Sequence, residues 1–162
     1  MSLLLLVMTL LLDTLQRLTT YTFILSIIIF LYKGLPKPVN EIIRTLAVIV
    51  YICITYAYIR FGFKSVQKFY KQFGVIFNSK MYMVAFDYIV HSLPVLLIGL
   101  PTDPASMLYG YIIFVGWYML VRKNITRLYL TDIPLIRYDE IIFAVVPVIL
   151  YVYYIVLDLM KK

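Results

Sequence analysis

The chain is poor in the residues that build disulfide and metal frameworks. It contains one cysteine, Cys53, and one histidine, His91, among 162 residues. A single cysteine cannot form an internal disulfide, and the sequence has no CxxC pair or Cys/His cluster for a structural metal. Cys53 is therefore interpreted as a small apolar residue within a helix. Disulfide-stabilised and zinc-stabilised folds are excluded, and no metal site is predicted.

Charged residues are also scarce. Asp, Glu, Lys and Arg make up 14% of the chain, whereas 64% of its residues are hydrophobic. Soluble domains are about a quarter charged and about half apolar. This chain has too little polar surface to cover its core in water, so we expect lipid to be its solvent. Its net charge of +7 suits a bilayer with anionic headgroups, and nucleic acid is not predicted as a partner.

Common catalytic motifs are missing from the sequence as well. It has no phosphate-binding loop, no HExxH, no GxSxG and no paired-aspartate motif of lipid-headgroup transferases. No catalytic residue is predicted, and an enzyme is the less favoured class. No cofactor is predicted either, although bound lipid is compatible with this composition.

Long apolar runs are what the chain has in abundance. A membrane-spanning helix needs about 20 residues, with a tolerated range of about 17–25. The second and third of five apolar segments fit this length well, and the last two are at its lower limit. The fold class predicted is all-α: one transmembrane domain over 1–162, a polytopic bundle of about five spans. The segments are 3–32, 42–59, 81–100, 104–121 and 141–157.

Turn-forming sequences separate these segments. "KGLPKPVN" (33–40) combines Gly, two Pro and two Lys, so it ends one helix and turns the chain. Asn40 is predicted to cap the second helix, with Glu41 at its positive end. "GLPTDP" (99–104) predicts a tight turn, and residues 122–140 are expected to form a longer polar loop.

The first segment has a polar stripe that allows two interpretations. Asp13 and Arg17 are spaced to pair on one helical face, and Thr9, Gln16 and Thr20 share that face. In the preferred interpretation, the segment is one tilted span whose intramembrane ion pair faces protein. In the other, a surface helix extends to about residue 17 and a short span follows, so that the chain has four full spans.

Basic residues near the helix ends predict the orientation. With five spans, the linkers after the second and fourth segments share a side and carry nine Lys and Arg, against five on the other side. The positive-inside rule places the N-terminus inside and the C-terminus outside. The membrane expected is a prokaryotic plasma membrane or an organellar inner membrane. The nine residues are Arg60, Lys64, Lys68, Lys71, Lys80, Arg122, Lys123, Arg127 and Arg137.

The linker after the second segment is the most regularly patterned stretch. Aromatic and apolar residues recur at spacings of three and four, and three lysines fall on the adjacent face. This pattern is typical of a basic amphipathic helix lying in the membrane interface, here near 61–78. A docking helix for another membrane subunit is the alternative. The apolar face includes Phe63, Val66, Tyr70, Phe73 and Phe77, and the basic face has Lys64, Lys68 and Lys71.

The third segment places a carboxylate and the only imidazole in an apolar run. Asp87 and His91 lie one turn apart on one face. Pro94 cannot donate to the carbonyl of Val90, so we expect a kink and a free acceptor there. Charged groups at membrane depth are costly and usually functional, and histidine is suited to proton transfer. Either these three residues form a proton or ion site, or His91 bonds to a helix carbonyl or to Asp87 and holds the kink.

The fourth segment carries small residues for helix packing, namely Ser106, Gly110 and Gly116. Three functions then compete. The favoured one is a non-catalytic accessory subunit of a larger membrane complex, with a respiratory or other energy-converting assembly as one host. The alternative is a proton- or ion-conducting module that uses Asp87 and His91. The third is a small membrane enzyme acting on lipid.

Overall fold

The computed structural model describes residues 18–32, 34–61, 67, 78–124 and 135–160, which form an all-α bundle. In this part of the chain, four helices are long and apolar enough to cross a membrane, as expected of an integral membrane protein. They are α3 (Lys37–Phe61), α5 (Lys80–Ile98), α6 (Pro104–Val121) and the continuous run of α8 (Leu135–Glu140), η2 (Ile141–Val145) and α9 (Val146–Met160). Shorter elements are α2 (Leu18–Leu31) and η1 (Arg122–Asn124).

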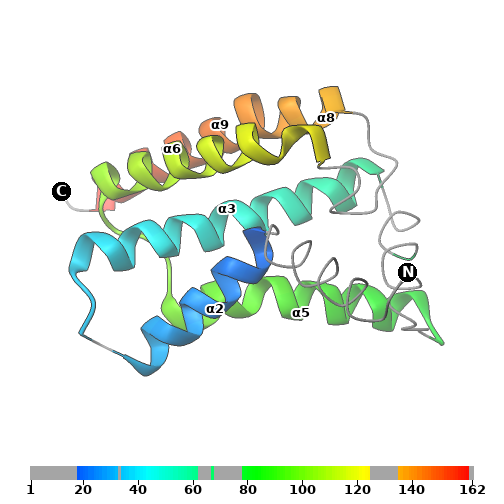
Figure 1. Ribbon diagram of the computed structural model, residues 1–162, viewed down its shortest axis with the longest axis horizontal. Helices are drawn as coiled ribbons and strands as arrows, with labels where there is room; N and C mark the ends of the chain where they lie inside the picture. Colours follow the sequence, from blue (N-terminus) through cyan, green and yellow to red (C-terminus); the bar gives the residue numbers. More distant parts are fainter. Residues whose placement is uncertain (1–17, 33, 62–66, 68–77, 125–134, 161–162) are drawn as a thin grey trace, which may run out of the picture.

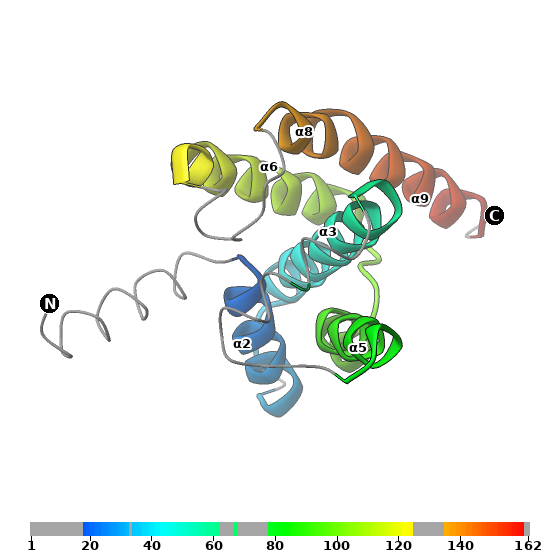
Figure 2. The same cartoon turned by 90° about the vertical axis from the view of Figure 1, so that its right-hand side faces the viewer.

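Helix α3 is the centre of the bundle. It lies between the pair α6 and α9 on one side and the pair α2 and α5 on the other (Figures 1 and 2). In the most apolar stretch of α3, 44% of the residues are buried, whereas the corresponding fraction is 22–33% in the other three spans. One apolar cluster joins α3 to α6, η2 and α9, and a second joins α3 to α2 and α5. Since both faces of α3 are covered by protein, it can carry polar groups that lipid would not accept.

Helices α3 and α6 approach each other closely through Gly110. A Cβ atom added at Gly110 would lie 2.7 Å from Thr45 Cβ and 3.3 Å from the main-chain oxygen of Ile42. Ser106, one turn earlier on α6, is also buried. Close approach of this kind requires small residues at the contact.

The fifth span contains a π-helical turn that ends two residues before Pro147. Proline has no N–H and its ring clashes with the preceding helical turn. Here the N–H of Val146 donates to the carbonyl of Ile141, five residues back, which leaves the carbonyl of Ile142 without its usual donor. The Tyr111 hydroxyl on α6 donates to that carbonyl at 3.0 Å. A neighbouring helix thus satisfies the group that proline frees, as is common in membranes.

Two expectations about helix ends are wrong. Helix α3 begins at Lys37, so Asn40 lies inside the helix and its side-chain Nδ2 donates backward to the carbonyl of Leu35 at 3.2 Å. The polar loop expected over 122–140 is shorter, because residues 135–140 are helical. Both helices extend into polar residues because charged and amide side chains find partners at the ends of the bundle.

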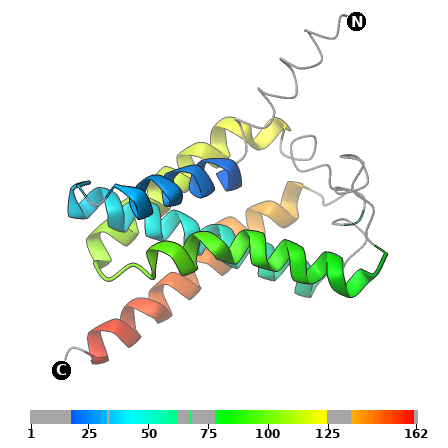
Figure 3. The ribbon, with the colours of Figure 1, turned by 90° about the horizontal axis from the view of Figure 1, so that it is seen from below.

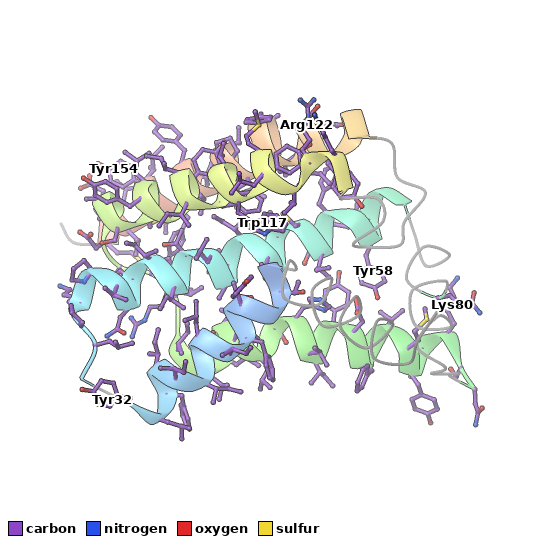
Figure 4. All side chains as sticks on the ribbon, viewed as in Figure 1. Tyr32, Tyr58, Lys80, Trp117, Arg122 and Tyr154 are labelled. Atoms are coloured by element: carbon purple, nitrogen blue, oxygen red, sulfur yellow. The ribbon has the colours of Figure 1, made fainter. Side chains whose placement is uncertain are left out.

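The two ends of the bundle differ in composition. We call one the basic end, where Lys80 and Arg122 lie, and the other the turn end, where Tyr32 and Tyr154 lie (Figure 4). Seen from below, the C-terminal part of α9 projects obliquely from the bundle (Figure 3). Helix α2 has 14 residues, about 21 Å at 1.5 Å per residue, less than a bilayer core. Whether 1–17 complete a span stays a prediction, because they lie outside the described residues.

Candidate functional site

The candidate site is built on the first half of α5. Ser79 caps this helix, since its hydroxyl accepts from the N–H of Met81 at 3.2 Å. Asp87 follows seven residues after Lys80, about 10 Å along the helix axis. Its side chain points to the interior of the bundle, and the residue is only 3% exposed. A carboxylate is therefore buried within an apolar, membrane-length helix.

A tyrosine from α3 contacts this carboxylate. Tyr58, in the last turn of α3, donates its hydroxyl to Asp87 Oδ2 at 2.6 Å. It is itself buried and lies between α3 and α5 (Figure 4). The Tyr58 ring stacks on the Tyr88 ring with centroids 5.0 Å apart, and Tyr51 packs edge-on against the Tyr88 ring. Aromatic packing thus holds the phenol in place for its hydrogen bond.

His91 lies one turn deeper, on the same face as Asp87. Its Nδ1 is 2.8 Å from the main-chain oxygen of Asp87 and 3.4 Å from Oδ1 of the same residue. A carbonyl oxygen can only accept, so Nδ1 carries the hydrogen and Nε2 has the lone pair in the neutral ring. His91 therefore combines the expected bond to a helix carbonyl with a nitrogen that can take up a proton.

Pro94 is buried one turn beyond His91, and α5 runs through it as one helix. It supplies no N–H for the carbonyl of Val90. The structure thus brings Asp87, His91 and Pro94 together over two turns of one helix and adds Tyr58 from its neighbour.

The chemistry of these groups favours a proton over a metal ion. Both donors named here, the Tyr58 O–H and the His91 N–H, point their hydrogens at Asp87. A hard cation needs several oxygen acceptors instead. No group of three His, Cys, Asp or Glu with metal-binding geometry occurs in the described part of the chain. The arrangement holds a carboxylate beside a phenol and an imidazole, and because Nδ1 donates to Asp87, Nε2 is the imidazole nitrogen left with a lone pair.

A second buried carboxylate, Glu41, was not predicted as a site residue. It is 3% exposed, and its Oε2 accepts from the main-chain N–H groups of Thr102 and Asp103. Its Oε1 accepts from the Thr102 hydroxyl at 3.3 Å and from Arg44 Nη1 at 3.2 Å. With four donors, this carboxylate clamps the α5–α6 turn onto the first turns of α3. The sequence indicated this site only through the charge of Glu41, which directly precedes the apolar segment 42–59.

A third polar cluster, also missed from the sequence, lies at the basic end. Asp139 accepts from the Tyr118 hydroxyl and from Arg122 Nη2, the latter at 2.7 Å. The hydrogen bond to Asp139 raises the pKa of the Arg122 guanidinium above its ordinary value. Tyr56 donates to Glu140 next to it at 2.9 Å. These contacts tie α3 and α6 to the start of the fifth span.

The remaining predicted residues fall into two groups. Ser106 and Gly110 are buried against neighbouring helices, whereas Gly116 is exposed and an added Cβ there would meet no described atom within 4 Å. Gly116 therefore makes no close helix contact within the described chain, and its packing role stays a prediction. The other predicted residues lie outside the described part, so their roles stay predictions. They are Asp13, Arg17, Phe63, Lys64, Lys68, Tyr70, Lys71 and Phe73.

Comparison with known proteins adds no assignment: no protein family, curated protein or solved structure matches this chain.

Proposed function

We propose that this integral membrane protein binds and releases a proton at Asp87, with Tyr58 and His91 positioning the carboxylate and sharing the proton. The observation that carries the proposal is the hydrogen bond of 2.6 Å between the Tyr58 phenol and the Asp87 carboxylate, inside a membrane-length helix. An ionisable group at this depth is costly, which makes a functional role the default interpretation.

The proposed cycle needs no other reactant than the proton. The Asp87 carboxylate takes up a proton and becomes a neutral acid, which removes the cost of a charge in an apolar environment. Alternatively the proton binds Nε2 of His91, and the resulting imidazolium pairs with the carboxylate 3.4 Å from its Nδ1. Release reverses either step.

Infrared spectroscopy of the purified protein in lipid tests this directly. A band from a protonated carboxylic acid is expected to appear on acidification and to be absent from Asp87→Asn. Tyr58→Phe removes the phenol donor to this carboxyl group, so the frequency of the band is expected to shift. Asp158→Asn, an exposed change on α9, is the matched control. A band that persists unchanged in Asp87→Asn contradicts the proposal, as does the lack of any such band in the wild type.

An accessory role in a larger membrane complex is the second candidate, and Gly116 favours it. This glycine lies on the exposed face of α6, among Ile112, Ile113 and Leu120, which are 49–86% exposed. A glycine on an outer face lets another helix approach closely. Extraction in mild detergent and mass spectrometry of comigrating proteins tests this role. Defined partners that are lost in Gly116→Leu support it, and a free monomer in the native membrane extract contradicts it.

A further inference from the structure

We infer that the Asp87 site exchanges protons with the basic end of the bundle only, and that an apolar seal separates it from the turn end. This inference rests on the proposed function and specifies how the proton reaches the site. Tyr58 lies three residues before the end of α3, and Asp87 lies about 10 Å from the start of α5. The polar groups therefore begin close to the basic end.

The polar groups form a series that runs from the basic end toward the interior of the bundle. From the basic end it runs from Tyr58 to Asp87 and then to His91, which lies about 6 Å farther along α5. Thr55, one turn inward from Tyr58 on α3, has a buried hydroxyl that lacks a hydrogen-bond partner among the described groups. At a similar depth to Thr55, the carbonyl of Val90 lacks its usual main-chain donor, because Pro94 has no N–H. These are the groups that a water molecule or a mobile proton would use.

Beyond Pro94 the interface between α2, α3 and α5 becomes apolar. Four buried side chains close it, and we call them the apolar seal: Ile29, Ile43, Ala47 and Ile98. They lie in the second half of α2, the first half of α3 and the last turn of α5. Leu25, Leu35, Val95 and Leu97 pack against them. All eight side chains are aliphatic, so this packing opposes the passage of a proton toward the turn end. The buried hydroxyl of Ser26, one turn before Ile29, bonds within its own helix to the carbonyl of Thr22.

The charged and titratable groups around the site agree with this direction. On α3 they are, among the described residues, Tyr51, Tyr58 and Arg44. Arg44 lies between Ile43 and Ala47 at the depth of the seal and pairs with Glu41, and its positive charge opposes the entry of a proton. On α5 they are Lys80, Tyr88 and His91. The buried polar residues of α2, Thr22 and Ser26, do not titrate, and Tyr21 is exposed. Glu41 lies at the turn end, where four donors already occupy its oxygens.

The consequence is a proton-binding site without a through path. The wild-type protein is expected to change its protonation state when the pH changes at the basic end, while conducting few protons across a membrane. A conducting state would require the seal to open.

Vesicles of known orientation test the inference. The orientation is read by labelling Lys123→Cys in a Cys53→Ala background with a membrane-impermeant maleimide. The external pH is then lowered rapidly while the carboxylic acid band of Asp87 is followed. The band is expected to respond when the basic end faces outward, and to stay unchanged until the lumen acidifies when it faces inward. A response through the turn end, or equally through both ends, overturns the inference.

A seal variant gives an independent measurement. Ile98→Asn introduces a polar side chain into the seal, and passive proton flux into vesicles is expected to rise about tenfold because the apolar barrier is shortened. Ile112→Asn, on the exposed face of α6, is the matched control and should leave the flux at the wild-type level. Equal flux in both variants contradicts the seal. If Asp87 shows no protonation from either side, the proposed function itself fails, so the two failures are distinguishable.

Discussion

At the scale of single residues, three acidic side chains of the described chain are stabilised in the same way, because each accepts hydrogen bonds from a neighbouring element. Glu41 receives main-chain and side-chain donors, Asp87 receives a phenol, and Asp139 receives a phenol and a guanidinium. Tyrosine suits this role because its ring packs well in apolar surroundings while its hydroxyl donates a hydrogen bond to the carboxylate. Tyr58 therefore serves as a donor to a buried acid, and Tyr118 to a half-buried one.

Replacing the Glu41 carboxylate should weaken the fold strongly. Glu41→Ala leaves the buried N–H groups of Thr102 and Asp103 without an acceptor, and each such loss costs about 1–3 kcal/mol. We expect the free energy of unfolding to fall by about 2–4 kcal/mol. Circular dichroism during unfolding by sodium dodecyl sulfate would measure it. Glu140→Ala removes an exposed acid whose bond from Tyr56 is open to solvent, so it should cost less than about 1 kcal/mol, and equal losses would argue against the clamp.

The residues of the candidate site were only half predictable. Asp87 and His91 stood out because a charge and an imidazole interrupt an apolar run. Tyr58 did not, because one tyrosine among many carries no sign of its partner 29 residues away. Glu41 was visible as a charge, yet its donors lie 61 and 62 residues later in the chain. Sequence periodicity reports the face of a helix, whereas pairing across helices depends on packing.

At the scale of helices, boundaries were predictable where local chemistry defines them. Helix α6 was expected over Pro104–Val121 and is found there, since Asp103 caps it by accepting from the N–H of Ser106 and proline suits the first turn. Helix α3 was expected to start after an Asn40 cap, four residues later than its observed start at Lys37. Pro38 is tolerated in a first helical turn, so "KPVN" continues the helix instead of ending it.

The π-helical turn of the fifth span makes a specific prediction for Tyr111. Tyr111→Phe removes the donor to the Ile142 carbonyl and leaves that oxygen unsatisfied in an apolar environment. We expect a loss of about 1–2 kcal/mol in the free energy of unfolding. Tyr109→Phe, on an exposed part of the same helix, should change it by less than about 0.5 kcal/mol. If the two variants unfold alike, the hydroxyl does not stabilise the turn.

The two glycines of α6 should respond to alanine with opposite signs. Gly110→Ala places a methyl group against Thr45 and the α3 backbone, so the helices must separate at a cost of about 1–3 kcal/mol. Gly116→Ala meets open space and gains helix propensity, so stability should be unchanged or rise by up to about 1 kcal/mol. Thermal unfolding in detergent distinguishes them, and destabilisation of both variants would show that the helix contact has been misassigned.

At the scale of the whole molecule, the all-α class followed from composition, but the arrangement around α3 did not. Continuous apolar runs specify spans and leave open which helix is enclosed by the others. The central position of α3 comes from particular contacts, such as Gly110 with Thr45 and Tyr58 with Asp87. Its burial on both faces explains why the helix with the most polar contacts can be the innermost one.

The two ends of the bundle should label from opposite sides of a membrane. In a Cys53→Ala background, Thr102→Cys lies in the α5–α6 turn and Lys123→Cys follows α6. An impermeant maleimide should modify Thr102→Cys in intact cells, whereas Lys123→Cys should react only in inverted vesicles, because the positive-inside rule places the basic end inside. Labelling of both positions from one side would refute the transmembrane arrangement, and reversed labelling would refute its orientation.

The donors of the Glu41 clamp are synthesised at different times as each new chain is made. Its main-chain donor on Thr102 follows Glu41 by 61 residues. At roughly 5–20 residues per second, a ribosome makes that donor about 3–12 s after the carboxylate. Arg44, by contrast, emerges within the same helical turn and bonds to Glu41 at 3.2 Å in the finished protein. Arg44 can therefore pair with the Glu41 carboxylate before the main-chain donors of Thr102 and Asp103 have been synthesised, and it keeps this bond after they have joined it.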